Sequence, residues 1–282
     1  MLKLSAGHPL CSLLKTQLNS MQFVQTQLKT QQQRLLRHLD NWLHANQFSW
    51  HRSIEDLPYA CKAHQLLLRR QLQNLDPRYQ ENKITNLAIA LRSLDGILIR
   101  PGEVFSFWQQ IGKPTRAKGY LEGLQLSKGD IKIVIGGGLC QLANLLYWMA
   151  LHTPLEVLER HHQSFDSFPD DHRTLPFGTG ASVSFNHWDL RFYNPTDRTF
   201  QLRVWIDEEN LKGLVLVDQP LRATYRVYEK NHHFICHSGR TFRTNEIWRS
   251  RIDRRSGRCL KDELMLKNFA EVKYSLERSE KV

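Results

Sequence analysis

The sequence contains no long apolar run. A helix that crosses a bilayer needs about 20 mostly apolar residues, and no segment of the 282 residues approaches that length. The N-terminus also lacks the features of a secretory signal, because His8, Pro9 and Lys15 interrupt its apolar residues. These two absences predict a cytoplasmic protein.

Cysteine is scarce, and its spacing forms no pairs. The five cysteines are Cys11, Cys61, Cys140, Cys236 and Cys259. An odd number without paired spacing favours a reducing compartment over a disulfide framework. Zinc-finger spacing and a phosphate-binding loop are also missing, and the run Asp170-Asp171-His172 has no partners at fixed spacing. We therefore expect no metal ion and no cofactor.

Basic residues outnumber acidic ones, and the formal net charge is +11. Many of them gather toward the C-terminus, at Arg240, Arg243, Arg249, Arg251, Arg254, Arg255 and Arg258. Phe242 and Trp248 lie among them, as in surfaces that bind nucleic acid or anionic lipid headgroups. Acidic residues such as Glu246 and Asp253 dilute this charge, so a solvated basic face is favoured. We expect no nucleic-acid partner, and peripheral contact with an anionic membrane is the remaining alternative.

Hydrophobic spacing divides the chain into three regions. Residues 12–45 carry leucines and aromatics at helical spacing, and a second helix is predicted over residues 59–75. Alternating segments with glycine and proline between them predict strands at residues 96–100, 104–108, 131–135, 155–160, 181–194 and 200–206, with a small β extension after Pro220. The predicted fold class is α+β, with a helical region at 1–78, a mixed helix and strand domain at 79–218 and a basic, β-rich extension at 219–282.

The most informative segment is Gly136-Gly137-Gly138-Leu139-Cys140-Gln141, which runs directly into the apolar residues 142–151. The spacing predicts a helix that begins at Cys140. Three glycines permit a sharp turn and leave room for a ligand to approach, while a helix start favours the thiolate and lowers the pKa of a cysteine. Cys140 is therefore either a nucleophile or, as free cysteines often are, a buried structural residue.

Histidine and aspartate follow Cys140 in the order that some cysteine hydrolases use. A strand after Thr153-Pro154 delivers His161 and His162, and a later strand carries Asp189. A base must take the thiol proton, and a third group must orient that base. Cys140, His161, His162 and Asp189 are thus the candidate catalytic residues, with the N–H groups of Cys140 and Gln141 as oxyanion donors. Adjacent strand residues point to opposite faces, so at most one of the two histidines faces Cys140.

Several stretches resemble the VanW family in order and spacing. They are Tyr79-Gln80-Glu81-Asn82-Lys83, Asn86-Leu87, residues 96–108, Gly119-Tyr120, Glu122-Gly123-Leu124, residues 136–141, residues 151–155, Glu159-Arg160-His161, Asp189-Leu190 and Asn194. The resemblance covers about residues 79–218. It implies a cell-envelope context and, for some members, cysteine-dependent L,D-transpeptidase activity on peptidoglycan. The candidate substrate-binding residues are Gly136, Gly137, Gly138, Gln141, Tyr120, Glu122, Arg160 and Gln163.

Two positions depart from the family pattern. Gln163 stands where members usually have a histidine, and Gly180-Ala181-Ser182-Val183 stands where they often have Asp-Ala-Thr-Val. Glutamine cannot accept a thiol proton. Either His161 or His162 is then the base, with His161 favoured because the pattern retains it, or the activity is lost while the fold remains. Two functions stay open: a cysteine-dependent acyl transferase or amidase acting on peptide stems of peptidoglycan precursors, and a non-catalytic accessory or precursor-binding protein of the cell envelope.

Overall fold

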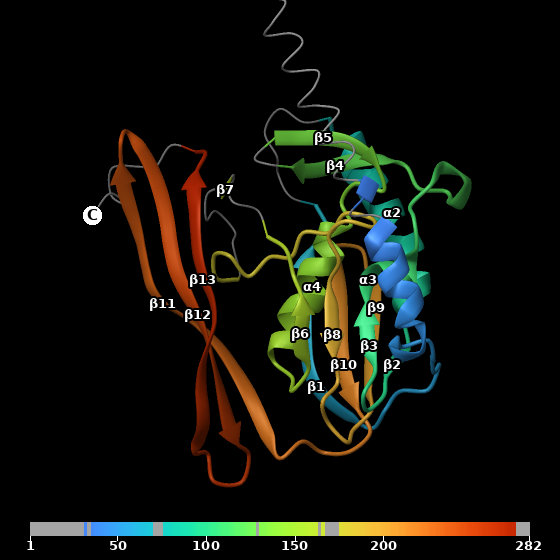
Figure 1. Cartoon of the computed structure of the whole chain (residues 1–282), viewed down its shortest axis with the longest axis vertical. Coiled ribbons are helices and arrows are strands. Elements are labelled where there is room, and N and C mark those ends of the chain that lie inside the picture. Colours follow the sequence, from blue (N-terminus) through green and yellow to red (C-terminus); the bar gives the residue numbers. More distant parts are fainter. Residues whose placement is uncertain are drawn as a thin grey trace, which may run out of the picture. The chain divides into compact units, whose positions relative to one another are not determined.

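The computed structural model describes residues 31–32, 35–69, 76–127, 130–162, 165–166 and 175–274 (Figure 1). The chain divides into two compact units, Met1–Asn46 and Gln47–Val282. In the first unit residues 31–32 and 35–43 are helical, whereas most of the helix predicted over residues 12–45 lies outside the described residues. The elements that position the candidate site all belong to the second unit.

A four-stranded antiparallel sheet supports the two long helices of this unit. Its order is β1 (Tyr59–Leu67), β10 (Asn210–Val217), β9 (Phe200–Ile206) and β2 (Ile97–Ile99). The prediction of a helix over residues 59–75 is wrong at β1, which pairs with β10 along its whole length. The alanine, lysine, glutamine and leucine residues of β1 favour a helix locally. Pairing with a strand far along the chain overrides that preference, as strand formation depends strongly on context.

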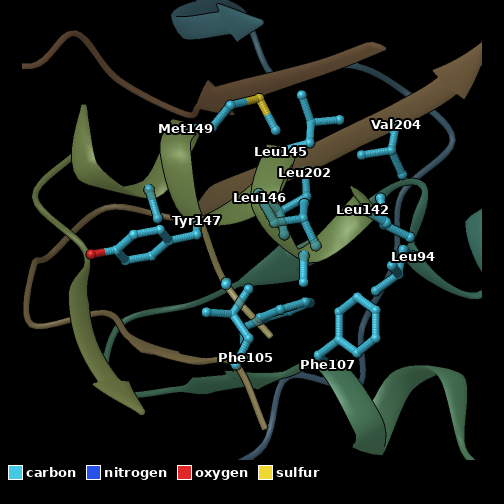
Figure 2. Packing of buried hydrophobic residues seen from close by; sticks show 14 of the residues in the cluster. Leu94, Phe105, Phe107, Leu142, Leu145, Leu146, Tyr147, Met149, Leu202 and Val204 are labelled. Atoms are coloured by element: carbon cyan, nitrogen blue, oxygen red, sulfur yellow. The ribbon is translucent and has the colours of Figure 1, made fainter. Parts of the chain in front are cut away.

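Two helices pack against this sheet. The first, α2 (Arg78–Leu94), lies along β9, and the second, α4 (Cys140–Leu151), lies over β1 and β10 with nine of its twelve residues buried. Gly213 of β10 permits this close approach, because a Cβ there would lie 2.5 Å from Met149 Cε. Figure 2 shows leucines of α4 gathered in one hydrophobic cluster with Leu202 of β9 and Phe105.

A three-stranded sheet contributes the other strands of this core. Its order is β3 (Val104–Ser106), β8 (Arg191–Tyr193) and β6 (Glu156–Glu159). The strand predicted over residues 104–108 ends at Ser106, whose hydroxyl accepts the N–H of Gln109 and begins the short helix α3 (Phe107–Ile111). The strand predicted over residues 181–194 is confined to β8. Asn186 adopts a φ of 53°, and the chain turns between Ser184 and Trp188.

The remaining elements are two short 3-10 helices, a hairpin and a C-terminal sheet. They are η1 (Ala45–Gln47), η2 (Arg116–Lys118), the hairpin β4 (Glu122–Ser127) and β5 (Asp130–Ile135), and the sheet of β11 (Ala223–His237), β12 (Arg240–Asp253), β13 (Cys259–Val272) and β7 (Phe165–Asp166). The strands predicted at residues 131–135, 155–160 and 200–206 are confirmed, and the β extension after Pro220 has longer strands than predicted. The chain therefore combines helices and mostly antiparallel sheets, as the α+β class requires. Among the described helices, none is long and apolar enough to span a membrane.

His152 follows α4 directly and is partly buried. Its Nδ1 lies 2.9 Å from Trp148 O, and its ring packs edge-on against the Trp148 indole with the ring centroids 4.7 Å apart. Burial is the main reason that the pKa of His152 falls from 6.5 to about 4, and the charges of Lys62, His64 and Arg249 act in the same direction. The folded protein therefore favours the neutral imidazole.

We expect the free energy of unfolding to fall as the pH drops from 6.5 to about 4. The unfolded chain binds a proton on His152 throughout this window, whereas the folded chain does not, so a contribution on the order of 3 kcal/mol is present above the window and lost within it. Urea unfolding across this pH range measures the effect. His152→Gln should flatten the dependence, and the exposed His233→Gln should leave it unchanged. Equal pH slopes for the wild type and His152→Gln would contradict this account.

Candidate functional site around Cys140

The three glycines before Cys140 pack against other parts of the chain. A Cβ added at Gly136, Gly137 or Gly138 would lie 2.5, 2.1 or 2.2 Å from atoms of Pro114, Gly123 and Lys83, respectively. Gly136 and Gly138 also have φ angles of 77° and 97°, a region that favours glycine. The room that we predicted for an approaching ligand is thus occupied by Pro114, β4 and α2.

Asn86 of α2 holds this glycine loop in place. Its fully buried side chain donates from Nδ2 to Gly137 O at 2.9 Å and to Leu121 O at 3.0 Å, and its Oδ1 accepts from Leu121 N at 2.8 Å. One amide thereby satisfies three backbone groups. The sequence marks Asn86 only as part of the family pattern. A polar residue on the face that α2 buries with Leu87 and Ala90 is the signal that could have identified it.

Three candidate substrate-binding residues lie next to this loop in different environments. Tyr120 is 2% exposed, and burial raises its pKa to about 12. The partly exposed carboxylate of Glu122 pairs with Arg116 at 2.5 Å. Gln141 donates from Nε2 to Leu67 O at 2.6 Å, while its buried Oε1 has no partner among the described residues. Gln141 therefore retains an acceptor that a ligand donor would satisfy.

Cys140 is the first residue of α4, as the sequence predicts. Its Sγ lies 3.9 Å from Val183 O, and among the described residues no histidine nitrogen lies within hydrogen-bonding distance of it. Burial raises the pKa of the Cys140 thiol, although its hydrogen bonds to backbone act in the opposite direction. The lowered pKa that we predicted from the helix start is wrong, because removal of the thiol from water outweighs the favourable field.

Residues 178–183, which we call the covering segment, lie along the face of α4 that carries Cys140. Successive turns of this face present Cys140, Asn144 and Tyr147. Ala181 N donates to Asn144 Oδ1 at 2.6 Å, and Val183 O faces Cys140 Sγ. On its other side the segment is held by Arg160, which donates to Gly178 O and Gly180 O, and by His161, whose carbonyl accepts from Ser182 N at 2.8 Å.

His161 pairs with a carboxylate that sequence reasoning missed. Its Nε2 lies 3.0 Å from Glu159 Oε1, and its ring stacks on Trp188 with the ring centroids 5.4 Å apart. Asp189 N donates to the same Glu159 oxygen at 2.9 Å. The sequence contains a signal for this pair, because Glu159 and His161 are two residues apart and residues i and i+2 of a strand share one face.

Asp189 is buried, and its carboxylate oxygens accept several hydrogen bonds. They accept from Ser106 Oγ at 2.5 Å, Trp108 N at 3.1 Å and Arg191 Nε at 2.9 Å, and also from Leu190 N. Two of these donors lie at the start of α3, where a carboxylate is favourable. The described contacts of Asp189 therefore join α3 to β8, and His161 is paired instead with Glu159.

The other candidate residues are placed as follows. His162 is exposed at the end of the β6 region, whereas Gln163 and the run Asp170-Asp171-His172 lie outside the described residues. No group of three potential metal ligands occurs in the described part of the chain. The candidate site therefore brings together Cys140, the covering segment and the backbone of His161, while the side chains of His161 and Asp189 form separate contacts.

The sequence places this chain in the VanW family, to which it belongs. Residues 82–216 match the family described as VanW like protein. The vancomycin B-type resistance protein VanW of Enterococcus faecalis (strain ATCC 700802 / V583) is 32% identical over 223 residues, which are 79% of this chain and 81% of the relative. The uncharacterized protein YoaR of Bacillus subtilis (strain 168) is 29% identical over 121 residues, 42% of this chain and 37% of the relative. No solved structure matches the chain significantly.

We expect Gly137→Ala to destabilise the protein by roughly 3 kcal/mol, because the new Cβ would meet the backbone of Gly123, which cannot rotate away. Gly102→Ala is the matched control. Gly102 has a φ of 79° but open space around it, so only backbone strain of about 1 kcal/mol is expected. Urea unfolding of both variants makes the comparison. A smaller loss for Gly137→Ala than for Gly102→Ala would contradict the close packing of the glycine loop.

Proposed function

We propose that this protein acts in vancomycin resistance as an accessory protein that binds a peptidoglycan precursor or its peptide stem without cleaving it. Membership of the VanW family and the name of the enterococcal relative, a vancomycin B-type resistance protein, support the resistance context. The environment of Cys140 is the observation that favours binding of the precursor over its cleavage. A cysteine nucleophile acts as a thiolate, and burial in this site favours the neutral thiol.

The covering segment supports the same conclusion. The Val183 carbonyl of this segment faces Cys140 Sγ, so the thiol has its polar partner inside the protein and not on a substrate. The segment is held by Asn144 on one side and by Arg160 and His161 on the other. Gln163 stands where the family usually has a histidine, and a glutamine side chain cannot act as a base. The four described cysteines are free thiols, which supports our proposal that the protein works in a reducing compartment such as the cytoplasm.

A cysteine-dependent acyl transferase or amidase is the second candidate, and one observation favours it. Cys140 and His161 contact consecutive residues of the covering segment, Val183 and Ser182. A peptide that replaced this segment would lie between the thiol and the histidine strand. Cys140 would then attack the peptide carbonyl while His161 takes the thiol proton and Glu159 orients the imidazole. The C–N bond would break as His161 returns that proton to the leaving amine, and water or a second amine would release the acyl group from Cys140. This function requires the covering segment to leave the thiol.

Alkylation rates separate these two functions. We expect brief iodoacetamide treatment of the folded protein to modify the exposed Cys236 and Cys259 first. Cys140 and Cys61 should react roughly tenfold or more slowly, because burial raises the pKa of both thiols and that of Cys61 reaches about 11. Mass spectrometry of the digested protein measures each rate, and a urea-unfolded sample should show similar rates for all sites. Fastest modification of Cys140 would support the enzyme instead.

Replacing Cys140 tests the function in cells. We expect Cys140→Ala to preserve vancomycin resistance in a strain that depends on this protein, because a binding role requires the fold and not the thiol. Asn86→Leu, which leaves three buried backbone groups without their partner, should reduce both stability and resistance. The minimum inhibitory concentration of vancomycin is the readout, with immunoblotting to compare protein levels. Loss of resistance in Cys140→Ala at a normal protein level would overturn the accessory role.

A further inference from the structure

A cavity of about 480 Å³ lies between the core and the C-terminal sheet. Tyr147 of α4, Glu156 of β6 and Arg160 line it from the core, and Arg249 of β12 lines it from the opposite side. Its apolar walls include Met265 and Leu266 of β13. This volume lies within the range of small-molecule sites, which combine apolar walls with a few convergent polar groups.

Arg160 carries a positive charge that no described carboxylate balances. Its guanidinium donates to the carbonyls of Gly178 and Gly180 and stacks over the Tyr147 ring at 5.0 Å. Burial lowers its pKa, which shows that its surroundings disfavour the charge. Arg160 is partly buried, and a cation that is partly withdrawn from water is more stable when an anion pairs with it. An anionic group in the cavity would supply that pairing.

Tyr147 contributes a donor in the same place. The residue as a whole is 2% exposed, but its hydroxyl oxygen is not among the fully enclosed polar atoms without a partner, and it donates to no described residue. In Figure 2 the hydroxyl oxygen points away from the leucines of the hydrophobic cluster. A hydroxyl that makes no hydrogen bond to protein can donate to an acceptor on a ligand, and the cavity that Tyr147 lines provides the space for one.

Arg249, unlike Arg160, is paired with a carboxylate. Its Nε and Nη2 donate to Glu263 Oε1 at 2.8 and 2.6 Å, and its Nη1 donates to Thr153 O at 3.2 Å. Its charge is therefore balanced and its position fixed. The exposed Glu156 lies at the cavity as well and adds a negative charge. One unbalanced cation beside one carboxylate suits a singly charged anion better than a doubly charged phosphate.

We propose that this cavity binds the C-terminal carboxylate of a short peptide. Arg160 and the Tyr147 hydroxyl donate to the carboxylate, and the walls formed by Met265 and Leu266 receive the adjoining small aliphatic side chains. Glu156 accepts an N–H of the peptide. The peptide class rests on the proposed precursor-binding function, whereas the carboxylate follows from Arg160 and Tyr147 themselves.

Calorimetric titration of the full chain tests this site. The probes are N-acetyl-alanyl-alanine in its all-L and all-D forms, the matching C-terminal amides, and inorganic phosphate. We expect one or both free acids to bind and the amides and phosphate to bind at least roughly tenfold more weakly, because only the free acids offer a single negative charge beside an apolar group. Tyr147→Phe should weaken binding of the acid by roughly tenfold and leave the amide unaffected.

Controls make the outcomes distinct. Tyr228→Phe removes a hydroxyl that donates to Asp262 at 2.6 Å outside the cavity and should bind as the wild type does. Arg160→Lys keeps the charge but loses the planar donor geometry, and it should weaken binding more than Tyr147→Phe. Acid binding that is unchanged in Tyr147→Phe and Arg160→Lys would overturn this site while leaving the precursor-binding function intact. Equal binding of acid and amide, stronger binding of phosphate, or no binding of either acid would overturn the carboxylate proposal, and resistance measured with Cys140→Ala tests the function separately.

Discussion

The close backbone contact between Gly137 and Gly123 determines where α4 begins. Because neither residue has a Cβ, the loop before α4 lies directly against β4, and Asn86 of α2 then bonds to the carbonyl of Gly137. From this start α4 extends over β1 and β10, where Gly213 lies against the end of the Met149 side chain. The position of Cys140 is therefore a consequence of backbone packing at the start of the helix.

Two physical effects compete at Cys140, and burial is the stronger. The start of a helix stabilises negative charge by a modest amount, and that benefit declines beyond the first turn. Removal of a thiolate from water costs more, so the pKa of Cys140 rises in this site. The covering segment lies beside the thiol, since it faces Cys140 with a carbonyl and contacts Asn144 with an amide. Any chemistry at the thiol depends on this segment.

Two charged residues near the site, the buried Asp189 and the partly buried Arg160, differ in their partners. Asp189 receives several hydrogen bonds, including one from Arg191, and connects α3 to β8. Arg160 donates hydrogen bonds only to carbonyl oxygens among the described residues, and it lines a cavity. The carboxylate of Asp189 is paired within the protein, as expected of a charge that stabilises the fold. The guanidinium of Arg160 is not paired with a described carboxylate, so an anion from outside the protein would balance its charge. The distinction supports a binding function away from Cys140.

Local patterns in the sequence were sufficient for several elements. The apolar residues after Cys140 predict the helix that begins there, and alternating residues predict the strands at 131–135 and 200–206, since both periodicities arise from neighbouring residues. The order and spacing of motifs also identified the family. Other properties depend on residues far apart in the sequence. Tertiary pairing made residues 59–67 a strand, filled the space beside the three glycines, gave His161 the carboxylate of Glu159, and raised the pKa of Cys140. Burial and long-range pairing set each of these outcomes, and neither is encoded in local spacing.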